Sequence, residues 1–287
     1  MSFTKILCPI DFSAGSRQAM QFAVRLAGQA HAELVLFHAS FVPATAFSLE
    51  APFPPYLIQD MADEGQRLLD ESVRDAIAAG AKNTSSVMAI GVPWTMIVAQ
   101  LEKQAFDLCV IGTHGRTGLA RVVMGSVASA VIRHAPCSVL AVRPDNDIGE
   151  LKHVLVPTDF SESAMHAVEL AAGMVAADGE ITLLHVLDLP VAFTGQVGAE
   201  LARELDRRSA AALESVAARM KTARVNPRTR IGYPGAQTLR FLEEDPSVDL
   251  VVMGSHGRTG IKRILLGSVA EKVVRHARCP VLVARTR

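Results

Sequence analysis

The feature that most constrains how this chain folds is an internal repeat, which runs through nearly all of its 287 residues. The segment ILCPIDFS at residues 6–13 matches VLVPTDFS at residues 154–161. The longest match aligns residues 112–143 with residues 254–285 without a gap, and 19 of these 32 positions are identical. Shorter matches lie between these two, in the same order in both halves. A repeat of this kind predicts two tandem copies of one domain.

The repeat also predicts where the two domains lie. We expect the first domain over residues 1–145 and the second over residues 150–287, each of ordinary domain size. The segment RPDNDIGELK at residues 143–152 joins them. Its polar residues, proline and glycine are typical of a connection between domains.

Each half alternates short apolar runs with amphipathic stretches. The apolar runs are rich in Val, Ile and Leu on both faces, which is typical of strands buried on both sides. Strands are expected near residues 4–10, 33–39, 84–90, 107–112 and 138–142, and again near 152–157, 180–187, 224–231, 248–253 and 280–284. Helices in the first half are expected near residues 14–29, 59–79, 94–104 and 126–134. Helical crossovers between strands predict an α/β fold, with an open five-stranded parallel sheet in each domain and helices on both of its faces.

Side chains predict two further details of the helices. Ser13 and Ser161 are placed to cap the N-terminus of the first helix in each half. In the second helix of the first half, the apolar spacing predicts which side faces the core. That side carries Met61, Leu68, Leu69, Val73, Ala76 and Ile77.

Charge and composition argue against several classes of protein. Lys and Arg together number 29, as do Asp and Glu, so the formal net charge is zero and we expect no nucleic-acid partner. No apolar run is long enough to span a bilayer, so we expect no membrane partner. The opening residues, MSFTKILCPIDFS, do not resemble a signal peptide, and we expect a cytoplasmic location.

The four cysteines are Cys8, Cys109, Cys137 and Cys279, and none forms a C-x-x-C pair. Each falls in an expected strand or at its edge. We therefore expect buried, reduced thiols, in keeping with a cytosolic protein. A redox or metal-binding role is the alternative.

The repeated polar motifs all follow expected strands at their carboxyl ends. They are PID and PTD, then HA and HV, and then a glycine-rich loop. In open parallel sheets, ligands bind beyond the carboxyl ends of the strands, at the point where the strand order reverses. The placement of these motifs therefore predicts a binding site in each half.

The glycine-rich loop reads GTHGRTGLARVVMGS at residues 112–126 and GSHGRTGIKRILLGS at residues 254–268. Glycines let the backbone approach a ligand or adopt positive φ, and the helix start that follows offers unpaired N–H groups to an anion. Arg116 and Arg258 add positive charge. The loop is neither a Walker A motif nor a dinucleotide fingerprint. It is suited to a polyphosphate, and the alternative is a tight turn with no ligand.

Asp11 and Asp159 directly follow the first strand of each half. A carboxylate at this place can accept hydrogen bonds from a ribose, and the alternative is an aspartate that only helps to start the helix. His38 and His185 lie inside apolar strand ends, where we expect hydrogen-bonded core residues rather than ligands.

Four other histidines flank the loop and its helix. His114 and His256 lie beside the glycines, where contact with a phosphate and packing of the loop are both open. His134 and His276 end the helix that follows, where a cation suits the helix dipole, so we expect a structural role.

Together these residues resemble the universal stress protein family. The pattern Gly-x2-Gly-x9-Gly-Ser, after an apolar strand and before a valine, is similar to the nucleotide-binding signature of the family, and the first-strand motif Pro-x-Asp also fits. The resemblance covers nearly the whole chain as two tandem domains and is to the members that bind ATP. It implies a Rossmann-like fold of the adenine-nucleotide alpha-hydrolase type. It also implies dimers formed by pairing the last strands, either between the two halves of this chain or in a homodimer.

The resemblance further implies one adenine nucleotide site in each half, for ATP, ADP or AMP. The aspartate would hold the ribose, the backbone after the second strand would meet the adenine, and the glycines and serine would hold phosphates, which Mg²⁺ can accompany. The first site comprises Pro9, Ile10, Asp11, Ala39, Ile111, Gly112, His114, Gly115, Arg116, Gly125, Ser126 and Val127. The second site comprises Pro157, Thr158, Asp159, Val186, Met253, Gly254, His256, Gly257, Arg258, Gly267, Ser268 and Val269.

The expected function is an ATP-binding regulatory or stress-response module that reports its occupancy to a protein partner. Phosphoryl transfer usually needs a positioned base and metal-holding acids, and neither loop contains Asp or Glu. Slow ATP hydrolysis or phosphate transfer is the alternative, with His114 and His256 as the nearby bases. A third possibility is an interaction protein with vestigial sites.

The two halves differ most in one connection. Residues 40–57 are long, Pro-rich and aromatic, whereas their counterpart at residues 188–200 is shorter. A surface loop and a lid that makes the two sites unequal are both open.

Overall fold

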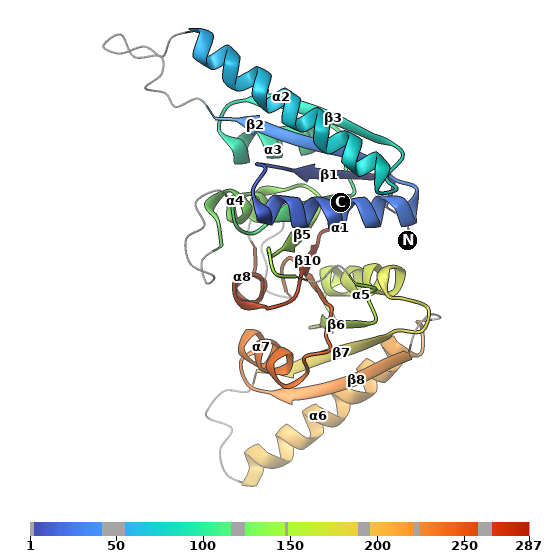
Figure 1. The fold of residues 1–287 in the computed structure, drawn as a ribbon. Coiled ribbons are helices and arrows are strands. Elements are labelled where there is room, and N and C mark those ends of the chain that lie inside the picture. Colours follow the sequence, from blue (N-terminus) through green and yellow to red (C-terminus); the bar gives the residue numbers. More distant parts are fainter. Residues whose placement is uncertain are drawn as a thin grey trace, which may run out of the picture. The chain divides into compact units, whose positions relative to one another are not determined.

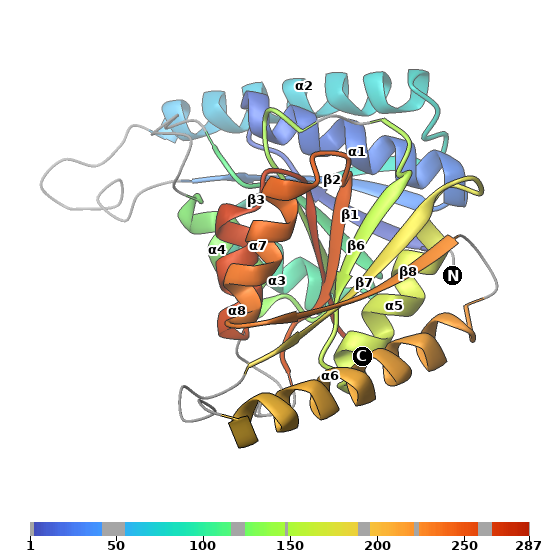
Figure 2. The ribbon, with the colours of Figure 1, turned by 90° about the horizontal axis from the view of Figure 1, so that it is seen from below.

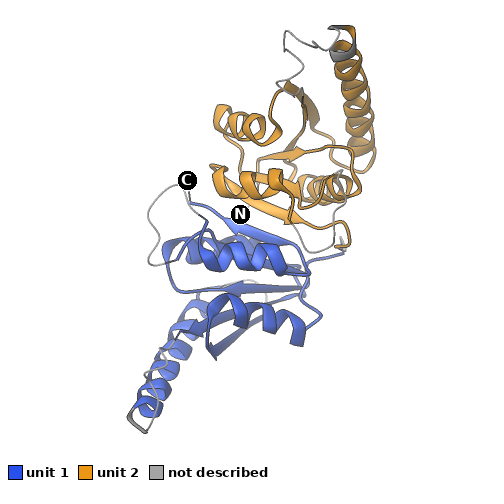
Figure 3. Ribbon diagram, turned by 90° about the vertical axis from the view of Figure 1, so that its left-hand side faces the viewer, with its two compact units in different colours: residues 1, 147–286 blue, residues 2–146, 287 orange. Residues whose placement is uncertain are grey.

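The computed structural model describes residues 3–41, 55–115, 124–146, 149–188, 196–220, 224–257 and 266–286. Apart from the two terminal residues, the chain divides into two compact units, which are residues 2–146 and 147–286 (Figure 3). We call them the N-terminal unit and the C-terminal unit, and each has its own strands and helices.

The N-terminal unit alternates strands and helices (Figure 1). Its elements are β1 (Lys5–Pro9), α1 (Ala14–Ala30), β2 (Glu33–Ser40), α2 (Pro55–Ala78), β3 (Thr84–Ile90), α3 (Pro93–Lys103), β4 (Leu108–Gly112), α4 (Ser126–His134) and β5 (Ser138–Val142). The strands pair in parallel in the order β3-β2-β1-β4-β5. The order reverses between β1 and β4, which places the topological switch point of this sheet at Asp11 and the glycine-rich loop.

The C-terminal unit has the same topology. Its elements are β6 (His153–Pro157), α5 (Glu162–Met174), β7 (Glu180–Leu187), α6 (Gln196–Ala217), β8 (Arg224–Ile231), α7 (Pro234–Glu244), β9 (Leu250–Gly254), α8 (Ser268–His276) and β10 (Val281–Ala284). The strand order is β8-β7-β6-β9-β10, again with parallel pairs. Figure 2 shows α7 and α8 on one face of this sheet, with α5 and α6 on the other. The predicted α/β fold is confirmed.

No described helix is long and apolar enough to cross a membrane. The two predicted helix caps are confirmed. The Ser13 side chain accepts a hydrogen bond from the Ser16 N–H at 3.2 Å, and the Ser161 side chain accepts one from the Ala164 N–H at 3.3 Å.

The predicted core face of α2 is wrong at both of its ends. Met61 is 45% exposed and Ile77 is 43% exposed, whereas Leu69 and Ala76 are buried. Gly65 is buried as well, and a Cβ atom built on it would lie 3.3 Å from the His38 ring. Because the helix approaches the sheet closely at a glycine, its buried side is narrower than the side that the large apolar residues indicate.

All four cysteines are buried and none forms a disulfide, as predicted. Burial raises the pKa of the Cys8 thiol far above its usual value. Burial also raises the pKa of Cys109, with smaller effects from the nearby Cys137 and Cys8. Such thiols stay protonated and are poor nucleophiles.

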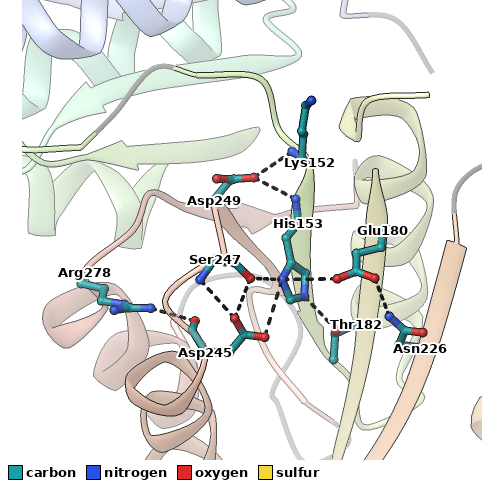
Figure 4. A network of polar contacts seen from close by, with 9 residues as sticks. All are labelled: Lys152, His153, Glu180, Thr182, Asn226, Asp245, Ser247, Asp249 and Arg278. Atoms are coloured by element: carbon teal, nitrogen blue, oxygen red, sulfur yellow. Dashed lines mark hydrogen bonds and ion pairs between the residues drawn. The ribbon is translucent and has the colours of Figure 1, made fainter. Parts of the chain in front are cut away.

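A polar network fixes the amino end of β6, opposite to the end where the glycine-rich loop lies (Figure 4). One carboxylate oxygen of Asp249 accepts the backbone N–H groups of Lys152 and His153, both at 2.8 Å. The buried His153 ring bonds to the hydroxyls of Ser247 and Thr182, both at 2.9 Å. These polar groups are satisfied within the network, which therefore anchors the strand.

Candidate functional site

The site begins at the carboxyl end of the first strand in each unit. In the N-terminal unit, Asp11 Oδ1 accepts the Ser13 N–H at 3.0 Å. In the C-terminal unit, Asp159 Oδ1 accepts the Ser161 N–H at the same distance. One carboxylate oxygen therefore helps to start the helix, which supports the structural interpretation of these aspartates. The second oxygen, Oδ2, faces the second glycine of the glycine-rich loop.

A bulky residue with positive φ follows each aspartate. Phe12 has φ 65° and Phe160 has φ 64°, a conformation that is rare for aromatic residues. Each ring packs on a histidine, with centroids 4.6 Å apart for Phe12 and His38 and 4.7 Å apart for Phe160 and His185. These phenylalanines are not among the predicted site residues, although the identical tripeptide DFS in both halves was a signal for them.

His38 and His185 are satisfied core residues, as predicted. Both rings are more than 90% buried. Each Nδ1 bonds to the carbonyl oxygen of the residue before the aspartate, at 2.8 Å in the N-terminal unit and 2.7 Å in the C-terminal unit. The two histidines therefore hold the backbone that presents the aspartate.

The first glycine of each loop allows close packing between the end of a strand and the start of a helix. A Cβ atom built on Gly112 would lie 2.7 Å from the Gly15 carbonyl oxygen, and one built on Gly254 would overlap the Ser163 hydroxyl. Neither glycine has positive φ, unlike Gly91 and Gly232 after the third strand of each unit. Of the two roles that glycine allows, these two described loop glycines serve close approach and not positive φ.

The second glycine of each loop meets the aspartate. A Cβ atom built on Gly115 would lie 2.8 Å from Asp11 Oδ2, and one built on Gly257 would lie 2.6 Å from Asp159 Oδ2. Two segments about 100 residues apart in sequence are therefore in contact in each unit. The contact is between a carboxylate oxygen of the aspartate and the backbone of the glycine.

The last glycine of each sequence motif closes the loop. The Gly125 N–H donates to the Thr113 carbonyl at 2.7 Å, and the Gly267 N–H donates to the Ser255 carbonyl at 2.8 Å. Each of these glycines is the N-cap of the helix that follows. Because glycine has no side chain, no side-chain hydrogen bond caps the first turn of α4 or α8. Such a helix start favours an anion through its N–H groups and its dipole. Ser126 and Ser268, the first helical residues, are exposed.

The loop histidines are held by the hydroxyl of the residue before them. His114 Nδ1 lies 2.9 Å from Thr113 Oγ1, and this hydroxyl also donates to the Val142 carbonyl at 3.3 Å. Nε2 is buried and has no hydrogen bond to a described residue. Burial and the nearby Arg143 lower the pKa of His114, which favours the neutral ring, whereas Asp145 acts in the opposite direction.

His256 repeats only part of this arrangement. Its Nδ1 lies 2.9 Å from Ser255 Oγ. The packing interpretation therefore holds for one nitrogen of each loop histidine. His134 and His276 lie in the last turns of α4 and α8, where the structural role was predicted.

The remaining expected site residues differ in how far their side chains are buried. Those whose side chains are buried in the core are Pro9, Ile10, Ile111, Thr158, Val186 and Met253. Those that are partly exposed are Ala39, Val127, Pro157 and Val269. A buried side chain leaves only its backbone for a ligand. Arg116 and Arg258 lie outside the described residues, as do residues 42–54 and 189–195 of the two unequal connections.

Within the described part of the chain, no group of three or more His, Cys, Asp or Glu side chains is arranged to hold a metal ion. The chemistry that the described residues offer is backbone N–H groups, one carboxylate oxygen and a helix start. These groups suit a ligand with both hydroxyls and phosphates.

Comparisons with known proteins agree with the duplicated fold. The model of the universal stress protein family matches residues 2–143 and, separately, residues 150–285. A universal stress protein of Mycobacterium tuberculosis is 30% identical over 304 residues, which covers 98% of this chain and 96% of that protein. A solved structure of a universal stress protein from Archaeoglobus fulgidus has a TM-score of 0.72 at 21% identity and covers 98% of each chain.

Proposed function

Because this chain belongs to the universal stress protein family, with one family domain in each half, we propose that it is an ATP-binding regulatory module with one nucleotide site in each unit. The observation that supports this most strongly is the meeting of the aspartate with the second loop glycine. Asp11 Oδ2 lies against Gly115, and Asp159 Oδ2 lies against Gly257, at the switch point of each sheet.

In this proposal, the aspartate accepts hydrogen bonds from the ribose hydroxyls through the oxygen that is not bonded to the helix start. The phosphates lie against the loop backbone and the first turn of α4 or α8. Each N–H bond to a charged oxygen contributes about 1.5–3 kcal/mol. The helix end adds about 0.3–1 kcal/mol. Any Mg²⁺ would be held chiefly by the phosphates themselves.

Binding rather than cleavage is favoured by what the loop contains. Neither copy has an Asp or Glu between its first glycine and its Gly-Ser pair. A site that holds phosphates without acids to position metal and water is suited to sensing a nucleotide. The module would then report its occupancy to a protein partner.

Thermal unfolding with and without ATP and Mg²⁺ tests the proposal. Ligand at about 100 times Kd should stabilise each unit by roughly 2.7 kcal/mol. No rise in Tm at millimolar ATP would contradict nucleotide binding. Where Tm rises, phosphate release over several hours distinguishes the two roles, since a sensor leaves ATP intact and a slow hydrolase converts it to ADP.

A further inference from the structure

The two units hold their glycine-rich loops in different ways. In the C-terminal unit, the Ser163 hydroxyl donates to the His256 carbonyl oxygen at 2.6 Å. The equivalent residue of the N-terminal unit is Gly15, which has no side chain. There the described donor to the His114 carbonyl is the Ser13 hydroxyl, at 3.5 Å.

The difference is built into the backbone and not only into the side chain. A Cβ atom built on Gly15 would overlap the His114 carbonyl oxygen. In the N-terminal unit, the His114 carbonyl therefore packs directly on α1 at Gly15. A serine at position 15 would fit only if this carbonyl moved. In the C-terminal unit, the loop stands far enough away for the Ser163 side chain to enter and bond to it.

We propose that the two nucleotide sites are unequal, and that Ser163 makes the C-terminal site the tighter one by holding residues 254–257, where the loop leaves β9, in place before the ligand arrives. The inference rests on the proposed function. Backbone that is already held in its bound position loses less conformational entropy on binding. Ser163 is 2% exposed, so water competes little for its hydroxyl. It acts on the loop and not on the ligand, which makes it a positioning residue.

The expected consequence is ordered filling of the sites. As the ATP concentration rises, the C-terminal site fills first and the N-terminal site fills at a higher concentration. One hydrogen bond of this kind corresponds to about a two- to tenfold difference in Kd. A chain with two unequal sites responds over a wider range of ATP concentration than a chain with two equal sites.

The test measures each site alone by isothermal titration with ATP and Mg²⁺, in the full-length chain. Gly115→Ala silences the N-terminal site, and Gly257→Ala silences the C-terminal site. We expect a lower Kd in the Gly115→Ala chain than in the Gly257→Ala chain. Adding Ser163→Ala to the Gly115→Ala chain should raise its Kd about two- to tenfold. Adding it to the Gly257→Ala chain should leave Kd unchanged.

Thr238→Val, added to the Gly115→Ala chain, provides the matched control. The Thr238 hydroxyl is buried in the same unit and donates to the Pro234 carbonyl at 2.8 Å, away from the loop. The control should lower Tm about as much as Ser163→Ala does but leave Kd unchanged. Equal Kd values at the two sites, or a Kd that does not respond to Ser163→Ala, would overturn the inference alone. Absence of ATP binding in the wild-type chain would overturn the proposed function as well.

Discussion

Replacing Gly115 and Gly257 with alanine in one chain is expected to abolish stabilisation by ATP while leaving the protein folded. Each new Cβ atom would lie within 2.8 Å of an aspartate Oδ2, a distance that real Cβ atoms do not adopt. The end of a side chain can move away at small cost, so the fold should survive. The carboxylate would then leave the place where it meets the ribose. The roughly 2.7 kcal/mol per site expected at about 100 times Kd should disappear.

The two single variants control for this result. Gly115→Ala and Gly257→Ala should each remove one site and leave the other. Circular dichroism and the Tm without ligand should remain close to those of the wild-type chain. A double variant with the wild-type response to ATP would show that the contact between the aspartate and the loop is not part of the site.

Gly112→Ala should have the opposite outcome, with a large loss of stability. Its Cβ atom would lie 2.7 Å from the Gly15 carbonyl oxygen and 3.0 Å from the Ser16 nitrogen, both in the backbone of α1. Backbone cannot rotate away as a carboxylate can, so α1 and β4 must separate. Overpacking of this kind typically costs about 1–3 kcal/mol. Urea unfolding of the N-terminal unit would measure it as a lower midpoint.

Gly28→Ala is the control for this variant, because it also adds a methyl group to a glycine and because Gly28 lies within α1. Its Cβ atom would lie 3.4 Å from the nearest atom, the Gly80 carbonyl oxygen, which is ordinary contact. In a helix interior, alanine is favoured over glycine by about 0.5–1 kcal/mol. Gly28→Ala should therefore be neutral or stabilising. Equal stability of the Gly112→Ala and wild-type chains would contradict the packing role of Gly112.

Most of the fold could be predicted from the sequence because the repeat and the apolar runs are strong local signals. The strands near residues 33–39 and 84–90 were placed to within one residue, since each contains a short apolar run. The buried side of α2 could not be predicted in the same way. Gly65, which is not one of the apolar residues that indicated this side, packs closely against His38, and only the tertiary structure reveals that approach.

Part of the candidate site could likewise be predicted from the sequence, and part could not. The glycine pattern and the two aspartates stand out in the sequence because they recur, and the structure brings them together at the strand ends. The positive φ of Phe12 and the hydroxyl of Ser163 could not be inferred from local sequence. The first depends on packing against His38, and the second depends on a contact across 93 residues. The unequal anchoring of the loops therefore became apparent only from the structure.

The most direct measurement of the central claim is the number of ATP molecules that the wild-type chain binds at saturation. Equilibrium dialysis with labelled ATP and Mg²⁺ provides that number without relying on stability. We predict two molecules per chain, because each unit brings an aspartate, a glycine-rich loop and a helix start together. A value of one would contradict a site in each unit, and a value of zero with folded protein would contradict nucleotide binding altogether.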